Sequence, residues 1–206
     1  MKMYLCSLVM FVCCSIAMAQ KPIVVIDPGH GGPDSGAMGT NGVLEKEVVL
    51  GIAKQCLQLN RSLFQDSLEI YLTRYTDTLV SLGTRARLAK ALGADAFVSL
   101  HCNQAPNEKA QGFEIFLFHG QANPKTTLMA TNLADRLQQQ LGIYDRGIKY
   151  ANFQVLRDTR GHCPSILLET GFISNAVEAD FAERTESQSA IALALLHSLI
   201  KTFQHD

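Results

Sequence analysis

The sequence has few charged residues and almost no net charge. Asp, Glu, Lys and Arg make up 18% of its 206 residues, and the formal net charge is −1 with a pI near 6.6. A disordered chain would be more charged and less apolar than the 47% hydrophobic content found here. A protein that binds nucleic acid through phosphate contacts would usually be basic. We therefore expect a folded protein without a nucleic-acid partner.

Several catalytic motifs are missing as well. The sequence contains no Gly-x-x-x-x-Gly-Lys-Ser/Thr, no Gly-x-Ser-x-Gly and no His-Glu-x-x-His. The glycine-rich stretch that starts at Gly29 resembles a dinucleotide loop, but Asp34 stands where the last glycine should be. These absences argue against a P-loop, a serine-hydrolase elbow, a zincin helix and a dinucleotide fold.

Long hydrophobic runs are also absent, apart from one near the start of the chain. Lys2 precedes an apolar run from Leu5 to Met18, which ends in Ala17-Met18-Ala19. The run is shorter than the roughly 20 residues that a membrane-spanning helix needs. A basic residue, a short apolar run and an A-x-A site are typical of a secretory signal peptide. We expect residues 1–19 to be removed on export, leaving residues 20–206 as one domain with no stable membrane anchor.

The number of cysteines falls by half when the expected signal peptide is excluded. Three of the six cysteines lie within it, and Cys56, Cys102 and Cys163 remain. An odd number cannot form a closed disulfide framework. We expect small buried thiols, although Cys102 and Cys163 each follow a histidine and leave open a cysteine nucleophile. Adjacent residues on a strand point to opposite faces, which argues against a dyad within either pair.

Apolar periodicity alternates between strands and helices along the rest of the chain. Strands are predicted at residues 22–26, 68–73, 96–100, 112–118, 154–156 and 165–168. Helices are predicted from residue 44 to about 63 and at 81–92, 124–141 and 190–203. This order predicts a single α/β domain, with a mostly parallel, twisted sheet of about six strands and helices on both faces.

Polar residues follow three of the predicted strands, and ligand sites in parallel sheets lie beyond the carboxyl ends of the strands. Asp27 and His30 follow the first, His101 the third and Glu169 the last. Two histidines, one carboxylate and an open position for water form a catalytic zinc site. Glu169 ends an apolar strand, where an unpartnered carboxylate is costly, so a functional role is favoured.

The carboxylate that completes such a site is ambiguous from the residues alone. Glu45 lies at the start of a predicted helix, where a glutamate ordinarily interacts with the helix dipole. The neighbouring Glu47 competes for the same role. A lone histidine is also more often structural than metal-binding, so each candidate has a simpler explanation when it is taken singly.

Blocks along nearly the whole chain after the leader together resemble the zinc-dependent N-acetylmuramoyl-L-alanine amidases of the Amidase_3 type, which cut peptidoglycan. The blocks are Val25-Ile-Asp-Pro-Gly-His-Gly-Gly32, Glu45-Lys46, Leu72-Thr-Arg74 with Asp77, Leu82 with Arg85, Val98-Ser-Leu-His-Cys-Asn103, Gly112-Phe-Glu114, Val155-Leu-Arg157 and Leu168-Glu-Thr-Gly-Phe-Ile-Ser-Asn175. Their number and order make the resemblance specific, although Cys102 replaces a usual alanine and the segment before Pro164 also departs from the usual pattern.

The resemblance implies one Zn²⁺ held by His30, Glu45 and His101, with Glu169 as the catalytic residue. It thereby favours Glu45 over Glu47. Supporting or substrate-binding roles are expected for Asp27, Asn103, Arg74 and Arg85, with the two arginines mainly in a structural network. The chain shows no space for an inserted inhibitory helix between His101 and Glu169, and no wall-binding module.

The implied activity is hydrolysis of the amide bond between the lactyl group of N-acetylmuramic acid and L-alanine. The implied partner is peptidoglycan or a muropeptide, and we expect a monomer that acts in the periplasm, elsewhere in the cell envelope or outside the cell. Three alternatives remain open: a non-catalytic peptidoglycan-binding protein of the same fold, a peptidase that cuts within the stem peptide, and a cysteine hydrolase.

Overall fold

The structure is a computed structural model and describes residues 20–120 and 123–204. The predicted signal peptide therefore lies outside the described residues. One sheet contains β1 (Ile23–Pro28), β2 (Glu69–Leu72), β3 (Ala96–Asn103), β4 (Phe113–Phe118), β5 (Asp145–Ala151) and β6 (Ser165–Phe172). The strand order is β2-β1-β3-β6-β4-β5. The predicted α/β class and six-stranded, mostly parallel sheet are confirmed.

The two strands at one side of the sheet run against the others. β1, β2, β3 and β6 pair in parallel, whereas β4 pairs antiparallel with β6 and parallel with β5. The starts of β4 and β5 therefore lie at the edge where β1, β3 and β6 end. This reversal brings two further segments to the edge at which a parallel sheet usually binds ligands.

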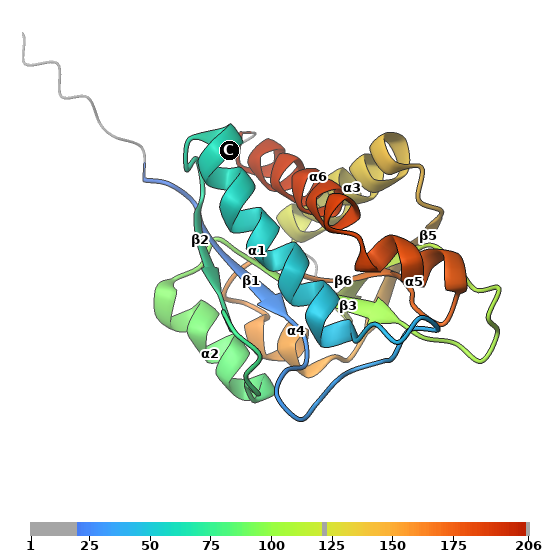
Figure 1. Ribbon diagram of the computed structural model, residues 1–206. Helices are drawn as coiled ribbons and strands as arrows, with labels where there is room; N and C mark the ends of the chain where they lie inside the picture. Colours follow the sequence, from blue (N-terminus) through green and yellow to red (C-terminus); the bar gives the residue numbers. More distant parts are fainter. Residues whose placement is uncertain (1–19, 121–122, 205–206) are drawn as a thin grey trace, which may run out of the picture.

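Helices cover both faces of the sheet (Figure 1). The elements are α1 (Glu45–Phe64), α2 (Leu82–Leu92), α3 (Pro124–Leu141), α4 (Gln154–Thr159), α5 (Ala176–Glu183) and α6 (Thr185–Phe203). Helices α1, α3 and α6 pack together on one face, and α2 packs with α4 on the other. Within the described residues, no helix combines the length and apolar character required to cross a bilayer.

The alternation of side chains along the strands builds a separate core under each helical layer. Val24, Ile26 and Val98 belong to the core beneath α1, α3 and α6. Val25, Phe97 and Leu167 belong to the core beneath α2 and α4. On this second face the side chains become polar towards the strand ends, and the candidate site lies there.

One predicted strand is wrong. Residues 154–156 form the first part of α4, and the sixth strand is β5. A short apolar run does not distinguish a buried strand from a buried helical turn, and Val155 and Leu156 are buried in a helix here. β5 is an edge strand of mostly half-exposed residues with Gly147 near its centre, so it lacks the apolar alternation of a typical strand.

Candidate metal centre and active site

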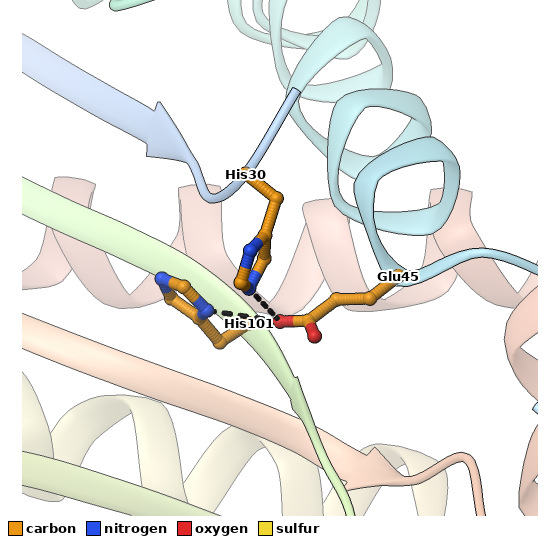
Figure 2. A group of neighbouring side chains, drawn as sticks. All are labelled: His30, Glu45 and His101. Carbon is orange, nitrogen blue, oxygen red and sulfur yellow. Dashed lines mark hydrogen bonds and ion pairs between the residues drawn. The ribbon is translucent and has the colours of Figure 1, made fainter. Parts of the chain in front are cut away.

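Two imidazoles and one carboxylate converge at the ends of β1 and β3. His30 Nε2 lies 3.0 Å from Glu45 Oε1, and His101 Nδ1 lies 2.9 Å from the same oxygen. Figure 2 shows both rings directed at this oxygen. His30 comes from the turn after β1 and His101 from β3, while Glu45 lies in the first turn of α1. The three potential ligand atoms lie within 4.8 Å of one another. The structure thus brings together the three residues that the resemblance indicated.

Glycine is required on both sides of this cluster. A Cβ atom at Gly29 would lie 2.3 Å from the His101 ring, so the backbone after β1 approaches that ring as closely as only glycine allows. Gly36 has a φ of 65°, and a Cβ atom there would lie 2.5 Å from Glu45 Oε2. The glycine-rich stretch that resembled a dinucleotide loop therefore encloses the histidine–carboxylate cluster.

Glu45 is buried and ionised. Its residue is 3% exposed, and its two oxygens also accept the backbone N–H groups of Ala37 and Cys102. Burial raises the pKa of this carboxyl, but hydrogen bonds from His101 and His30 outweigh that effect and hold its pKa far below the ordinary value. Glu47, the competing candidate, is exposed in the same first turn of α1.

Asp34 contacts the second ring nitrogen of His30. Its Oδ2 lies 2.9 Å from His30 Nδ1, and its Oδ1 accepts the N–H of Gly36. In the sequence, Asp34 stood out only as the residue that interrupts a glycine motif. Its spacing of four residues from His30 in a tight turn was the available signal, because carboxylates commonly orient metal-binding imidazoles in this way.

The chemistry of the donor set fits a divalent metal. A neutral imidazole has one N–H and one lone pair, so a His30 N–H that is used on Asp34 leaves the lone pair at Nε2. That lone pair faces the Glu45 carboxylate, and the arrangement is favourable only with a cation or a proton between them. In the metal-free chain the hydrogen bond to Glu45 accordingly raises the pKa of His30. Two histidines and one carboxylate match the ligands of catalytic zinc.

Glu169 lies beside this cluster with an unused oxygen. It is in register with His101 on the neighbouring strand, and its Oε2 is buried with no hydrogen-bond partner among the described residues. Burial raises its pKa to about 7, and the nearby charges of Glu45 and Glu114 act in the same direction. A carboxyl with this pKa can both accept and release a proton near neutral pH.

Asp27, Arg74 and Arg85 hold the backbone that carries His30. Arg85 donates to Asp27 and to the carbonyls of Pro28 and His30, and Arg74 donates to the carbonyls of Pro28 and Gly29. All three side chains are buried, which agrees with the structural network expected for the arginines. Among the described residues, no hydrogen bond joins these three side chains to the imidazole or carboxylate groups of the cluster.

Asn103 lies further along the same edge. Its side chain donates to Glu114 at 3.0 Å and accepts the N–H of Gln104. Glu114 also accepts hydrogen bonds from Arg146 and Lys149 on β5. Glu114 was not predicted as a site residue, because ligand sites are expected after the ends of parallel strands and Glu114 lies near the start of an antiparallel strand.

A cleft of about 370 Å³ opens over the cluster. His30, His101 and Glu169 line it on the side of the sheet. Leu79 before α2, Leu82 at the start of α2 and Phe153 before α4 also line it, and these apolar residues are between 37% and 54% exposed. The cluster is therefore accessible to a ligand of moderate size.

The three cysteines of the described residues are buried and unpaired. Burial raises the pKa of the Cys102 and Cys163 thiols, which disfavours the thiolate that a nucleophile requires. Cys102 follows His101 on β3, so the two side chains point to opposite faces of the sheet. The geometry does not support a cysteine hydrolase.

Residues 24–201 match the family described as N-acetylmuramoyl-L-alanine amidase (Amidase_3). The N-acetylmuramoyl-L-alanine amidase LytC of Bacillus subtilis (strain 168) is 37% identical over 172 residues, which are 84% of this chain and 34% of LytC. The amidase CwlM of Bacillus licheniformis is 34% identical over 180 residues, which are 87% of this chain and 68% of CwlM. The chain thus spans about a third of one relative and about two thirds of the other.

A solved structure shows the same fold. The N-acetylmuramoyl-L-alanine amidase AmiC2 of Nostoc punctiforme is 35% identical and superposes with a TM-score of 0.81. The alignment covers 90% of this chain and 98% of the AmiC2 chain. The fold and the sequence comparisons therefore indicate the same class of protein.

Proposed function

Because the chain belongs to the N-acetylmuramoyl-L-alanine amidase family, we propose that it hydrolyses the amide bond between the lactyl group of N-acetylmuramic acid and L-alanine in peptidoglycan. The reaction would release stem peptides from the glycan. One observation carries the proposal: three metal-ligand atoms converge beside a buried carboxylate with a free oxygen. The relatives are named for an amide bond of peptidoglycan, and residues 1–19 have the pattern of a signal peptide, so we further propose an exported protein that acts in the periplasm, elsewhere in the envelope or outside the cell.

We assign one Zn²⁺ to His30, Glu45 and His101. Such an ion supplies Lewis acidity towards a water molecule and a carbonyl oxygen. The ionised Glu45 supplies the negative charge that favours a divalent cation, and Asp34 fixes the orientation of the His30 ring. The two glycines beside the cluster leave room for the rings to approach each other.

Glu169 serves as the proton carrier in this proposal. Its free oxygen accepts a proton from water as the water attacks the amide carbonyl. The same carboxyl then delivers the proton to the nitrogen of L-alanine as the carbon–nitrogen bond breaks. A pKa of about 7 suits both steps, since the group must change its protonation state twice in each turnover.

Paired glutamine variants test the roles of the carboxylates. Glu45→Gln should lose both bound zinc and activity, whereas Glu47→Gln, two residues away on the exposed side of α1, should keep both. Glu169→Gln should keep zinc and lose activity by about 10²–10⁴-fold, as expected for a general base. Zymography on purified sacculi and elemental analysis of the protein provide the measurements.

The outcomes separate the alternatives. Full activity in Glu169→Gln with zinc retained would contradict the catalytic assignment. Binding to sacculi without any cleavage by the unmodified protein would instead indicate a wall-binding protein of the same fold.

A further inference from the structure

Polar side chains from four neighbouring strands form one row at the site edge. His101 on β3 is in register with Glu169 on β6, and Glu169 is in register with Glu114 on β4. On β5, Arg146 Nε donates to Glu114 at 2.7 Å and Lys149 Nζ donates to it at 2.6 Å. The row therefore begins at the metal cluster, passes the catalytic carboxyl and ends at two cations.

Arg146 and Lys149 together carry more positive charge than is needed to neutralise the Glu114 carboxylate. The Glu114 side chain is 6% exposed, and one positive charge is sufficient to balance it. Arg146 and Lys149 both pair with it, while their side chains remain 33% and 40% exposed. We call Arg146, Lys149 and Glu114 together the β5 cation pair with Glu114. These three residues carry a net charge of +1 next to an otherwise acidic site.

Both cations retain hydrogen-bond donors for a ligand. A lysine ammonium has three N–H donors and a guanidinium has five. Lys149 uses one on Glu114, and Arg146 uses Nε on Glu114 and Nη1 on the Gln111 carbonyl. The Arg146 guanidinium also stacks on the ring of Phe172 at 4.9 Å. Stacking and hydrogen bonds hold the charges in place, so little ordering is needed when an anion binds.

The proposed reaction sets the direction of the substrate along this row. The leaving nitrogen must lie beside Glu169 to receive its proton, while the carbonyl carbon lies towards the cluster on β1 and β3. The peptide then extends from Glu169 towards β4 and β5. Neighbouring strands are about 4.8 Å apart, so β5 lies roughly 10 Å from β6. The charged groups of Arg146 and Lys149 reach back to Glu114 on β4, one strand from β6, and an extended peptide that advances about 3.5 Å per residue therefore brings its second residue to them.

We propose that Arg146 and Lys149 form an anion subsite that binds a carboxylate on the second residue of the stem peptide. This inference rests on the proposed amidase function. It predicts a preference that the metal cluster does not supply: a peptide with a free carboxylate at that residue is cleaved faster than one with a carboxamide. The charge of the substrate at this position thereby becomes a determinant of specificity.

The test uses two synthetic muropeptides that differ only in a carboxylate or a carboxamide on the second residue. Values of kcat/KM are measured for both with the zinc-loaded protein, with Lys149→Gln and with Arg146→Gln. Lys54→Gln, an exposed lysine on α1, provides the matched control for loss of one charge. Each single variant leaves Glu114 with one cation, so its buried charge remains balanced.

We expect the unmodified protein and Lys54→Gln to prefer the carboxylate by about tenfold, as for one charge-assisted hydrogen-bonded pair. The ratio should fall towards one in Lys149→Gln and Arg146→Gln. A purely structural role would lower both rates together and keep the ratio, and that result would overturn the subsite. Equal rates for the two substrates with the unmodified protein would overturn it as well. Failure to cleave either substrate would instead contradict the amidase function itself.

Discussion

At the scale of single residues, the site depends on a strained position that tight contacts stabilise. His30 has a φ of 58°, a left-handed conformation that residues other than glycine rarely adopt. Its carbonyl accepts a hydrogen bond from Arg85, and its ring contacts Asp34 and Glu45. Strain of this kind persists when surrounding contacts over-determine the position, and it is common at functional sites.

Replacing Asp34 tests how the His30 ring is oriented. We expect Asp34→Asn to weaken zinc binding by about 10–100-fold, because the amide is a poorer acceptor for the imidazole N–H. The dissociation constant is measured by competition with a chromophoric chelator. Asp135→Asn, at an exposed position on α3, should leave it unchanged. Equal affinities in the two variants would contradict the role of Asp34.

The raised pKa of Glu169 predicts a pH-dependent cost to stability. Burial raises this pKa from 4.5 to about 7 in the metal-free chain, so the folded state holds a proton that the unfolded state loses between these values. Stability should therefore fall as the pH rises through that window. Metal-free Glu169→Gln lacks this loss. As the pH rises from 4 to 8, its free energy of unfolding should therefore increase by about 2–3 kcal/mol relative to that of the unmodified protein. Urea unfolding at both pH values measures the gain, and parallel pH profiles would refute it.

Single residues were predictable where burial alone made them unusual. His101 and Glu169 each follow an apolar run within a strand, and this position revealed them. Glu45 could not be separated from Glu47 on the residues alone, because the start of a helix favours either glutamate. Asp34 could not be recognised, since its contact with His30 depends on the path of a glycine-rich turn that apolar periodicity does not describe.

At the scale of elements, one buried carboxylate joins the strand ends. Asp27, in β1, accepts hydrogen bonds from Thr73 after β2, Arg85 on α2 and Ser99 on β3. These contacts fix the point at which β1 ends and the ligand-bearing turn begins. The strand and the helix it contacts therefore act together to position His30.

Removing the charge of Asp27 should destabilise the fold. Asp27→Asn leaves the buried Arg85 guanidinium without its counter-charge, which typically costs about 3–5 kcal/mol. The free energy of unfolding in urea measures the loss. Asp95→Asn provides the control, because Asp95 accepts from Ile23 at the other end of β1 and is exposed. A loss no larger in Asp27→Asn than in this control would contradict the account.

Elements with long apolar runs were predictable, and those at the margin of the sheet were not. Strands β1, β3 and β6 are buried on both faces and appear as continuous apolar runs. β5 carries charged residues because its side chains either donate hydrogen bonds to Glu114 or face the solvent. Its sequence therefore lacks the apolar pattern of a typical strand. The antiparallel pairing of β4 with β6 depends on long-range contacts, and local sequence does not encode it.

At the scale of the whole molecule, the sheet topology concentrates the chemistry at one edge. Strands β1, β3 and β6 end there while β4 and β5 begin there, so the candidate metal ligands, Glu169 and the β5 cation pair with Glu114 lie along one edge. The low overall charge means that general attraction to an anionic wall is weak. Substrate recognition should depend on local contacts along this edge.

Mass spectrometry of the products from purified sacculi tests the central claim most directly. The zinc-loaded protein should release peptides with a free amino-terminal L-alanine and leave glycan whose lactyl groups end in free carboxylates. A chelator should suppress both products, and added zinc should restore them. Peptides cut between stem residues with the lactyl amide intact, or products that a chelator leaves undiminished, would contradict the account.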